Sequence, residues 1–367
     1  MSIIATGTIG FGGSPWTIYS DGLLEIETGT IDWSGTTVKN SAWVPVSPWD
    51  DYALKIEKIE ILGPITAGPS IRHLFGGLLY VFEIIGLEKI NTSAVIDMTS
   101  LFENTRRLAA LDLSAWDTSA VTSMNSLFYN AWKLDTLDLT GWNTSAVVDM
   151  SKMFSGLKNL PSLDLTPLAT SSVTNMTSMF EDSTSLINLD VTGWNTSSVT
   201  KMTRMFCMAK NLTVLNLSSW NCASVKDMSL MFSETENLVN VNVSSWETSE
   251  VEDMTMMFYQ ASKLESLDLS SWDTTLGLDN KRDMNFMFEG TLSLNYLTLG
   301  PLFEFIFYCA DAAIPEIEPT SAYTGFWQNI GIGTASNPNG GNVLTSKQLM
   351  ETYEGNIMAD TYVWQPV

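Results

Sequence analysis

Two patterns of hydrophobic residues alternate along this chain, and the two together recur many times. In "VTSMNSLF" (121–128) apolar residues fall at i, i+3, i+6 and i+7, which favours one stripe of a short helix. In "LDTLDLT" (134–140) the pattern L-x-x-L-x-L favours a short strand whose alternate side chains point inward. Asp117, Thr118 and Ser119 precede the first pattern and are residue types that cap a helix. One unit is therefore predicted to contain a strand, a turn and a helical turn.

Phenylalanines show that this unit has a fixed period. Most stand 26 residues apart, and the last follows after 30, so about four residues are inserted within "GLDNKRD" (Gly277–Asp283). We expect this charged insertion to bulge outward, because its charges are costly to bury. The column consists of Phe102, Phe128, Phe154, Phe180, Phe206, Phe232, Phe258 and Phe288. A fixed period in the twenties predicts a solenoid, because one unit cannot bury its apolar face alone whereas stacked units can.

The predicted fold is an α/β solenoid with about eight 26-residue coils, each a short parallel strand plus a short helix. The first strand leucine of each unit should form a buried spine. Its members are Leu111, Leu137, Leu163, Leu189, Leu215, Val241, Leu267 and Leu297. Methionine and tryptophan also recur in columns. No His or Cys accompanies the methionines, so we interpret them as core and not as a soft-metal site. We interpret the tryptophans as buried turn residues and not as a sugar-stacking platform.

The ends of the chain depart from the period. Residues 1–70 should form a β-rich N-terminal domain, since "PWTIYSDGLLEIETGTI" has the alternation and Asp-Gly turn of a hairpin. Residues 71–300 form the repeat region, and Phe75 belongs to a degenerate first coil. Residues 301–367 read as a small C-terminal cap module with a short helix in "SKQLMETY". The single histidine, His73, lies in the first coil, and we expect it to be structural.

Composition narrows the classes of partner. The 41 acidic and 18 basic residues give a formal net charge of -23, which disfavours nucleic acid and anionic lipid headgroups. The three cysteines, Cys207, Cys222 and Cys309, have neither disulfide-framework nor zinc-site spacing and are expected to be small apolar residues. No apolar run is long enough to span a membrane, and no membrane insertion is expected. The N-terminus "MSIIATGTIGFGGSPW" lacks the features of a signal peptide.

The repeats resemble a known family. The unit "LDLTGWNTSAVVDMSKMF" (137–154) looks like the BspA-type leucine-rich repeats of bacterial surface proteins, whose hallmark is W-(D/N)-T-S-x-V-x-x-M-x-x-M-F. The resemblance is specific because it recurs over residues 71–300, and segments on either side are similar to those that flank such repeats. It implies a leucine-rich-repeat solenoid and a role in extracellular adhesion or recognition. The sequence differs from the family in having no signal peptide and no wall-sorting tail after Pro366.

That difference leaves two settings open for the protein. Such repeats also suit phage structural proteins, which assemble in the cytoplasm and need no export leader, so a phage virion and a bacterial cell surface are both possible locations. The expected partners are a bacterial cell-surface polysaccharide or protein, or other virion proteins. A purely structural decoration protein is the alternative. A glycan-active enzyme is a remote one, because no catalytic motif is present and the carboxylates lie in repeated columns instead of a singular pair.

The candidate ligand-binding residues lie between the two strand leucines, where alternation directs side chains away from the core. Ser or Thr follows each of them two residues later. One hypothesis is that this ladder bonds water and hydroxyls and keeps the face soluble. The other is that it binds a hydrogen-bond-rich ligand such as a wall polysaccharide, through Ca²⁺ held between carboxylates; no other cofactor is expected. The residues are Asp112, Asp138, Asp164, Asp190, Asn216, Asn242 and Asp268.

Overall fold

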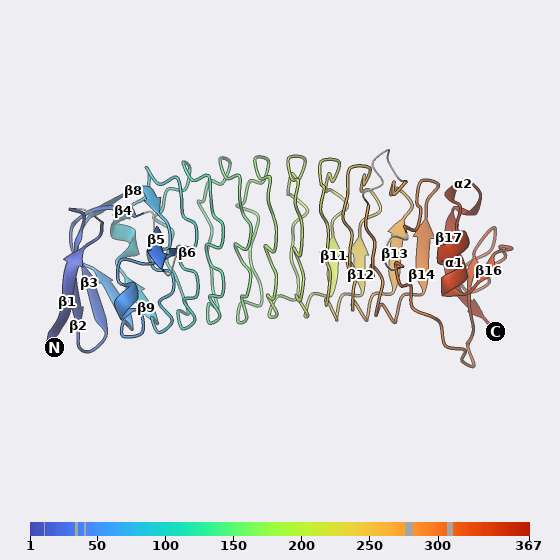
Figure 1. Cartoon of the computed structure of the whole chain (residues 1–367), viewed down its shortest axis with the longest axis horizontal. Coiled ribbons are helices and arrows are strands. Elements are labelled where there is room, and N and C mark those ends of the chain that lie inside the picture. Colours follow the sequence, from blue (N-terminus) through green and yellow to red (C-terminus); the bar gives the residue numbers. More distant parts are fainter. Residues whose placement is uncertain (11, 34–35, 40–41, 276–281, 307–310) are drawn as a thin grey trace. The chain divides into compact units, whose positions relative to one another are not determined.

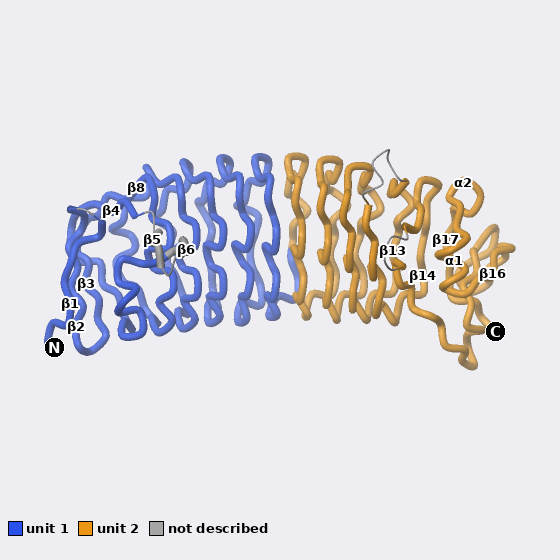
Figure 2. Tube along the Cα trace, viewed as in Figure 1, with its two compact units in different colours: residues 1–189 blue, residues 190–367 orange. Residues whose placement is uncertain are grey.

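Two compact units divide the chain, residues 1–189 and residues 190–367 (Figure 2). The computed structural model describes residues 1–10, 12–33, 36–39, 42–275, 282–306 and 311–367. Within each unit, successive repeats lie side by side as coils (Figure 1). The two units do not test the predicted domain boundaries at residues 70 and 300, which stay predictions.

The first unit begins with three small sheets, ordered β1-β2-β3-β7-β9, β10-β8-β4 and β5-β6. In the first sheet, β2 and β3 are antiparallel and turn at Asp21-Gly22, which confirms the predicted hairpin. Gly22 has φ 87°, a left-handed conformation that glycine adopts at no steric cost. The elements are β1 Ile3–Thr8, β2 Pro15–Tyr19, β3 Leu23–Ile26, β4 Gly29–Trp33, β5 Thr36–Lys39, β6 Ala42–Pro45, η1 Asp50–Tyr52, β7 Lys58–Ile61, β8 Ile65–Ile71, β9 Glu83–Ile85, η2 Leu87–Lys89 and β10 Ile90–Asn91.

The predicted helix in each repeat is wrong. Across residues 124–130, every second backbone N–H donates to a carbonyl of the next coil over 2.8–3.1 Å, and turn bonds such as Leu127 N–H to Met124 O fill the gaps. An α-helix would direct these N–H groups within its own coil. Residues with a left-handed backbone conformation, such as Ser126 (φ 56°) and Asn130 (φ 59°), turn the chain at regular intervals. As a result, every second backbone N–H points toward the next coil. The helix-like apolar stripe arises because these turns also bury Val, Met and Phe.

Because no helix forms in the repeat, the residues predicted to cap it have another role. Asp117 accepts the Ser119 N–H at 2.9 Å within its own turn. The buried Thr118 hydroxyl donates to the Asn143 carbonyl at 3.1 Å and accepts the Asn143 N–H at 2.9 Å, so it joins two coils. Equivalent buried threonines donate likewise at Thr92, Thr144, Thr196, Thr248 and Thr274. The threonine of the repeat is therefore an inter-coil connector.

Parallel strand pairing is confirmed in the second unit. Strands β11 Val214–Asn216, β12 Asn240–Asn242, β13 Ser266–Leu269 and β14 Tyr296–Leu299 pair in parallel, with one repeat as the register shift. In the first unit, the segments at Leu111, Leu137 and Leu163 do not form assigned strands. Single parallel bridges one residue before the Met column join the coils there, such as Asp97 with Ser123 and Ser123 with Asp149, and the second unit has the same bridges, such as Lys201 with Asp227. The expected strand is therefore confirmed in the four repeats of the second unit from Val214 on, and it is wrong for the first unit and for the segment at Asp190, where no strand is assigned.

Columns of identical side chains form the core. Every phenylalanine of the Phe column is 0% exposed, as predicted. Within the first unit, ring centroids from Phe75 to Phe180 lie 5.6–6.1 Å apart. The Met and Trp columns are buried too, which confirms their interpretation as core. The leucine spine is buried except at Leu137, which is only half-buried. The apolar residues two positions after the spine, such as Leu139, form a second column that is 0–1% exposed throughout.

The C-terminal part of the second unit covers the last coil. Strand β17 (Asp360–Pro366) pairs antiparallel with β14, and the sheet continues through β15 (Tyr323–Asn329) and β16 (Val343–Leu344). The predicted helix in "SKQLMETY" is confirmed as α1 (Ser346–Thr352), with a capping box between Thr345 and Gln348. A short α2 (Gly355–Met358) follows. Because β17 occupies the edge of β14, that strand offers no unpaired hydrogen-bonding groups on that side.

The repeat recovers its register after the insertion. Phe258 and Phe288 stack at 6.0 Å between centroids with planes 5° apart, despite the extra residues between them. Residues 277–281 lie outside the described residues, so the predicted bulge stays a prediction for them. Asp283 is part of the coil itself, where it forms a parallel bridge with Asp253. In the described part of the chain, no helix is long and apolar enough to cross a membrane.

Replacing Phe128 with Ala should lower the free energy of unfolding by about 3–5 kcal/mol, because Phe102 and Phe154 flank the ring and cannot both move into the cavity. Urea denaturation followed by circular dichroism measures the change. Phe128→Leu is the control and should cost clearly less, because it retains most of the buried volume. Equal stability of Phe128→Ala and the parent protein would show that the column does not hold the coils together.

Candidate functional site

The predicted ladder residues all point outward. In the first unit, Asp112, Asp138 and Asp164 are exposed at equivalent positions of consecutive repeats. In the second unit, Asp190 is exposed, and Asn216, Asn242 and Asp268 lie exposed on strands β11, β12 and β13. The alternation that placed them on the surface is therefore correct. Their role as ligands stays a prediction.

Each ladder side chain stabilises a turn. Its Oδ1 accepts the backbone N–H two residues later, at 2.8–3.1 Å in the first unit and 3.0–3.3 Å in the second. In several repeats the Ser or Thr hydroxyl donates to the same oxygen, as Ser114 does to Asp112 at 2.7 Å. Asn216 and Asn242 make the same bonds as the aspartates. The turn therefore needs an acceptor oxygen at this position and does not need a charge.

These bonds lower the pKa of three ladder aspartates, Asp112, Asp138 and Asp190. The hydroxyl and N–H of Ser114 hold the pKa of Asp112 below its ordinary value, while the neighbouring Asp138 acts in the opposite direction. Thr140 and Thr192 lower the pKa of Asp138 and of Asp190 in the same way. Donors to an ionised carboxylate stabilise the charged form. These side chains therefore carry negative charge at neutral pH.

The described residues provide no preformed metal site for the calcium hypothesis. Within the residues that the structure describes, no group of three or more His, Cys, Asp or Glu side chains is placed to hold a metal ion. Cys207 and Cys222 are buried, and burial raises the pKa of the Cys222 thiol. Cys309 lies outside the described residues.

His73 is a core residue, as predicted from its position. It is 8% exposed and packs against Gly76, where an added Cβ would lie 2.4 Å from Nδ1. Burial lowers the pKa of His73, and the opposing effect of Glu103 is smaller. The 3.7 Å separation between His73 Nδ1 and Glu103 Oε2 is therefore a contact of a neutral imidazole at pH 7 and not a charged pair.

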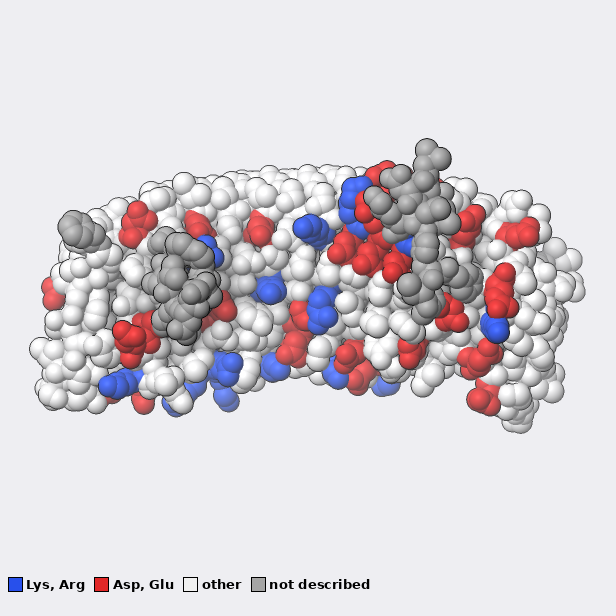
Figure 3. All heavy atoms as spheres, in the orientation of Figure 1, with Lys and Arg blue, Asp and Glu red and all other residues white. Residues whose placement is uncertain are grey.

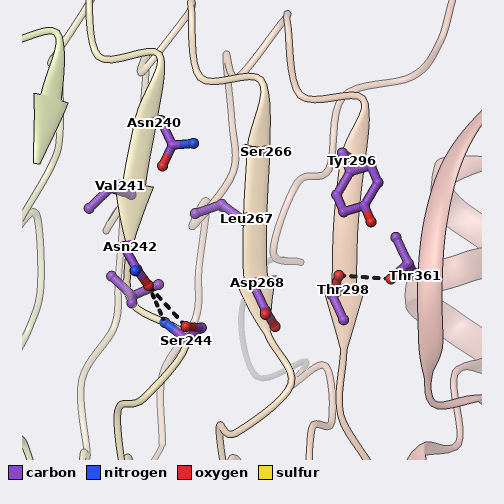
Figure 4. A pocket seen from close by; sticks show the side chains of 11 residues that line it. Asn240, Val241, Asn242, Ser244, Ser266, Leu267, Asp268, Tyr296, Thr298 and Thr361 are labelled. Atoms are coloured by element: carbon purple, nitrogen blue, oxygen red, sulfur yellow. Dashed lines mark hydrogen bonds between the residues drawn. The ribbon is translucent and has the colours of Figure 1, made fainter. Parts of the chain in front are cut away.

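A polar hollow of about 440 Å³ opens on the sheet face of the second unit (Figure 4). Two rows of outward side chains cross it. Asn240, Ser266 and Tyr296 form one row, because these residues are register partners on β12, β13 and β14. Asn242, Asp268, Thr298 and Thr361 form the other, ending on β17. The Thr298 and Thr361 hydroxyls lie 2.9 Å apart and are hydrogen-bonded.

The hollow combines amides, a carboxylate and one partly exposed ring. Asn240, Asn242 and Asp268 are exposed, and Tyr296 is 37% exposed. Val241 and Leu267 point into the core and hold the strands in place. Two ladder residues, Asn242 and Asp268, thus belong to a concave site. The other five lie outside it.

Sequence reasoning missed several residues of this hollow. Asn240 stands two positions before Asn242, and Tyr296 two positions before Thr298, so strand alternation directs both side chains outward. Thr361 could not be found in this way. It reaches the hollow only because β17 pairs with β14 from a distant part of the chain.

Comparison with known proteins relates this chain to one family and to several solved structures. A family model described as "Mycoplasma protein of unknown function, DUF285" matches residues 70–188 and 183–298, which together span more than half of the chain. No curated protein matches the sequence significantly.

The similar solved structures include two bacterial proteins described as leucine-rich and one vaccine antigen. A leucine-rich repeat protein from Eubacterium ventriosum is 16% identical, with TM-score 0.33 over 79% of this chain and 90% of that one. Pneumococcal vaccine antigen PcpA is 14% identical, with TM-score 0.36 over 83% and 84%. A leucine rich cell surface protein from Faecalibacterium prausnitzii is 12% identical, with TM-score 0.32 over 80% and 94%. At TM-scores below 0.5, no property of these proteins transfers to this chain.

Changing Asp138 to Ala should lower the melting temperature, because the Thr140 N–H loses its acceptor. Asp138→Asn should leave it nearly unchanged, because an amide oxygen accepts the same bond in the Asn216 and Asn242 turns. Differential scanning calorimetry at pH 7 compares the three proteins. If Asn is as damaging as Ala, charge and not the turn bond stabilises this position.

His73 should make stability fall in mild acid. Its folded pKa lies below the unfolded value of about 6.5, so the unfolded chain takes up a proton first as the pH falls. The contribution is therefore intact above pH of about 6.5 and is lost below it. Thermal unfolding of the parent and of His73→Gln at pH 7 and at pH 5.5 measures the effect. The parent should lose more stability than the variant; an equal loss would contradict the assignment.

Proposed function

The chain belongs to the family described as Mycoplasma protein of unknown function, DUF285, and we propose that it is a non-enzymatic recognition protein. Its ligand is a hydroxyl-rich molecule such as a cell-surface polysaccharide. Its place is the outside of a bacterial cell or of a phage virion, where adhesion or host attachment would use such binding. A repeat scaffold with an acidic surface, soluble at high concentration, suits this exposed setting.

The observation that carries the proposal is the polar hollow on β12, β13, β14 and β17. Asparagine amides both donate and accept, and the Asp268 carboxylate accepts, which matches the paired donors and acceptors of sugar hydroxyls. The partly exposed Tyr296 ring offers a flat apolar surface beside them. All these side chains stand on paired strands, so little ordering is required when a ligand binds.

The same composition favours binding over catalysis. Among the described residues that line the hollow, Asp268 is the one ionisable carboxylate, and none is His or Cys. Glycoside hydrolysis generally uses a pair of carboxyl groups on either side of the scissile bond. A single carboxylate among amides and hydroxyls can orient a sugar but provides no acid–base pair.

A structural decoration protein is the second candidate. It is favoured by the ladder of the first unit, where Asp112, Asp138 and Asp164 each accept a bond within their own turn. On this reading the ladder keeps the face soluble, and partners would be other virion proteins. The two candidates differ in whether the hollow has a ligand.

Binding of the intact protein to isolated bacterial cell walls tests the proposal. We expect saturable binding that falls when the walls are treated with periodate, which cleaves sugar vicinal diols, and that persists after protease treatment. Asp268→Asn/Tyr296→Ala should weaken binding at least about tenfold, the effect of losing one good polar or stacking contact. The Asn side chain preserves the turn bond to Ser270, so the fold is retained.

The control is Asp112→Asn/Asp138→Asn, which makes the Asp→Asn change twice on the ladder of the first unit. It should bind like the parent. Chelator added to the parent shows whether Ca²⁺ takes part, and a loss of binding would support the calcium hypothesis. If the parent binds no wall preparation, or if the hollow variant binds as well as the parent, the hollow is not the recognition site and the decoration role is preferred.

A further inference from the structure

A line of basic side chains follows one edge of the first unit. It comprises Arg106, Arg107, Lys133 and Lys158, which occupy the turns just before the buried Leu108, Leu134 and Leu160 of three consecutive repeats, together with Trp132; we call this set the basic strip. Lys and Arg gather along the lower edge of this unit in Figure 3. Four cations in three adjacent turns are unusual in a chain that has only 18 basic residues and a net charge of -23.

The Trp132 ring makes cation–π contacts with two of these side chains. The Arg106 guanidinium lies 4.0 Å from the ring centroid of Trp132, and the Lys158 ammonium lies 5.5 Å from it. Both distances are within the range of cation–π attraction. The indole N–H donates to Asn130 Oδ1 at 3.2 Å, which fixes the ring orientation. The ring thus offsets the repulsion between cations of neighbouring coils and positions them for an external anion.

Most of the basic strip is not neutralised by the protein. Among the residues described, no carboxylate lies within ion-pair distance of Arg106, Arg107 or Lys133, and Lys158 alone has one, Asp182 at 2.8 Å. The equivalent turn of the second unit is different: Lys210 pairs with Glu236 at 2.6 Å. An acidic protein could easily supply such partners, so their absence along the strip indicates an anion from outside.

We propose that the basic strip binds a linear phosphodiester polymer with a sugar or polyol backbone. The repeats present cations in register, one coil after another, so a polymer lying along the edge meets them successively. Arg guanidinium forks match the oxygens of a phosphate. Screening within about 8 Å at physiological salt limits repulsion from the more distant carboxylates.

Nucleic acid fits the basic strip less well, although it too is a phosphodiester chain. Single-strand binding relies on aromatic faces on which bases stack. The strip has one aromatic residue, Trp132, and Arg106 already lies over its ring. A duplex would also bring a second row of phosphates toward a protein with 41 acidic residues. A polymer without bases avoids both difficulties.

This inference goes beyond the proposed function, because the basic strip lies in the first unit and shares no residue with the hollow. The test measures binding of the full chain to synthetic poly(glycerol phosphate) by isothermal titration calorimetry at several salt concentrations. Neutral dextran is the uncharged comparison, and a single-stranded oligonucleotide of equal charge is the comparison with bases. We expect the polyol polymer to bind, dextran not to bind, and the oligonucleotide to bind more weakly.

Two triple variants with the same change in net charge identify the site. Arg107→Gln/Lys133→Gln/Lys158→Gln removes three exposed cations of the strip and should weaken binding at least tenfold, with the log–log salt slope shallower by about two. Lys210→Gln/Lys226→Gln/Lys263→Gln removes three lysines of the second unit and should bind like the parent. Trp132→Ala should weaken binding while all charges remain.

Several outcomes would overturn the proposal. They are no binding of poly(glycerol phosphate) by the parent at low salt, equal weakening by the two triple variants, and tighter binding of the oligonucleotide. Circular dichroism confirms that each variant is folded. Because periodate-sensitive wall binding depends on the hollow, it should survive in the strip variant, so failure of this proposal is distinguishable from failure of the proposed function.

Discussion

Hydrogen bonds between coils are the interaction on which the rest of this structure depends. Every second backbone N–H of the segment that carries the Met and Phe columns donates to the next coil. The threonine hydroxyls that follow the Trp column add a second connection between coils. Turn bonds within a coil satisfy only part of its backbone, and the neighbouring coil accepts the rest. The left-handed residues in each turn are intrinsically costly, by about 1–2 kcal/mol each. They persist because the alternative leaves buried N–H groups without acceptors.

In this arrangement, the inward residues that stabilise a coil are distinct from the outward residues that form its surface. Inward columns of Phe, Met, Trp and Leu are nearly invariant from one repeat to the next, because each must stack on its neighbour. Outward positions need only a turn acceptor or a strand-compatible side chain, so Asp and Asn exchange freely between Asp190 and Asn216. The same scaffold can therefore carry an amide-rich hollow in one unit and a basic strip in the other without a change in its core.

The sequence was sufficient for the features that repeat and insufficient for those that do not. Period, buried columns, the outward ladder, the hairpin at Asp21-Gly22 and helix α1 all follow from local patterns, and the structure confirms them. The predicted helix failed for a physical reason: Val121, Met124, Leu127 and Phe128 are buried in either conformation, so periodicity alone could not distinguish a helix from a series of turns bonded to the next coil. Leu137 shows that a column can be regular in sequence and uneven in burial.

The candidate sites show the same limit. Alternation placed Asp268 on the surface but could not reveal that β17 returns to complete a concavity beside it. Arg106 and Lys158 are 52 residues apart, and only the stacking of three coils brings both to Trp132. Clusters formed across repeats are visible in sequence once the columns are aligned and charge is followed down each of them. Contacts that come from the non-repeating ends are not.

The direction of the inter-coil bonds has a mechanical consequence. They run along the axis on which coils stack, so tension applied along that axis within a unit loads every interface in series, and coils should detach one by one, the weakest interface first. Each detached coil releases 26 residues, roughly 90 Å of extended chain. A protein held at one end and pulled at the other would lengthen in such steps and dissipate a load that would break a rigid tether.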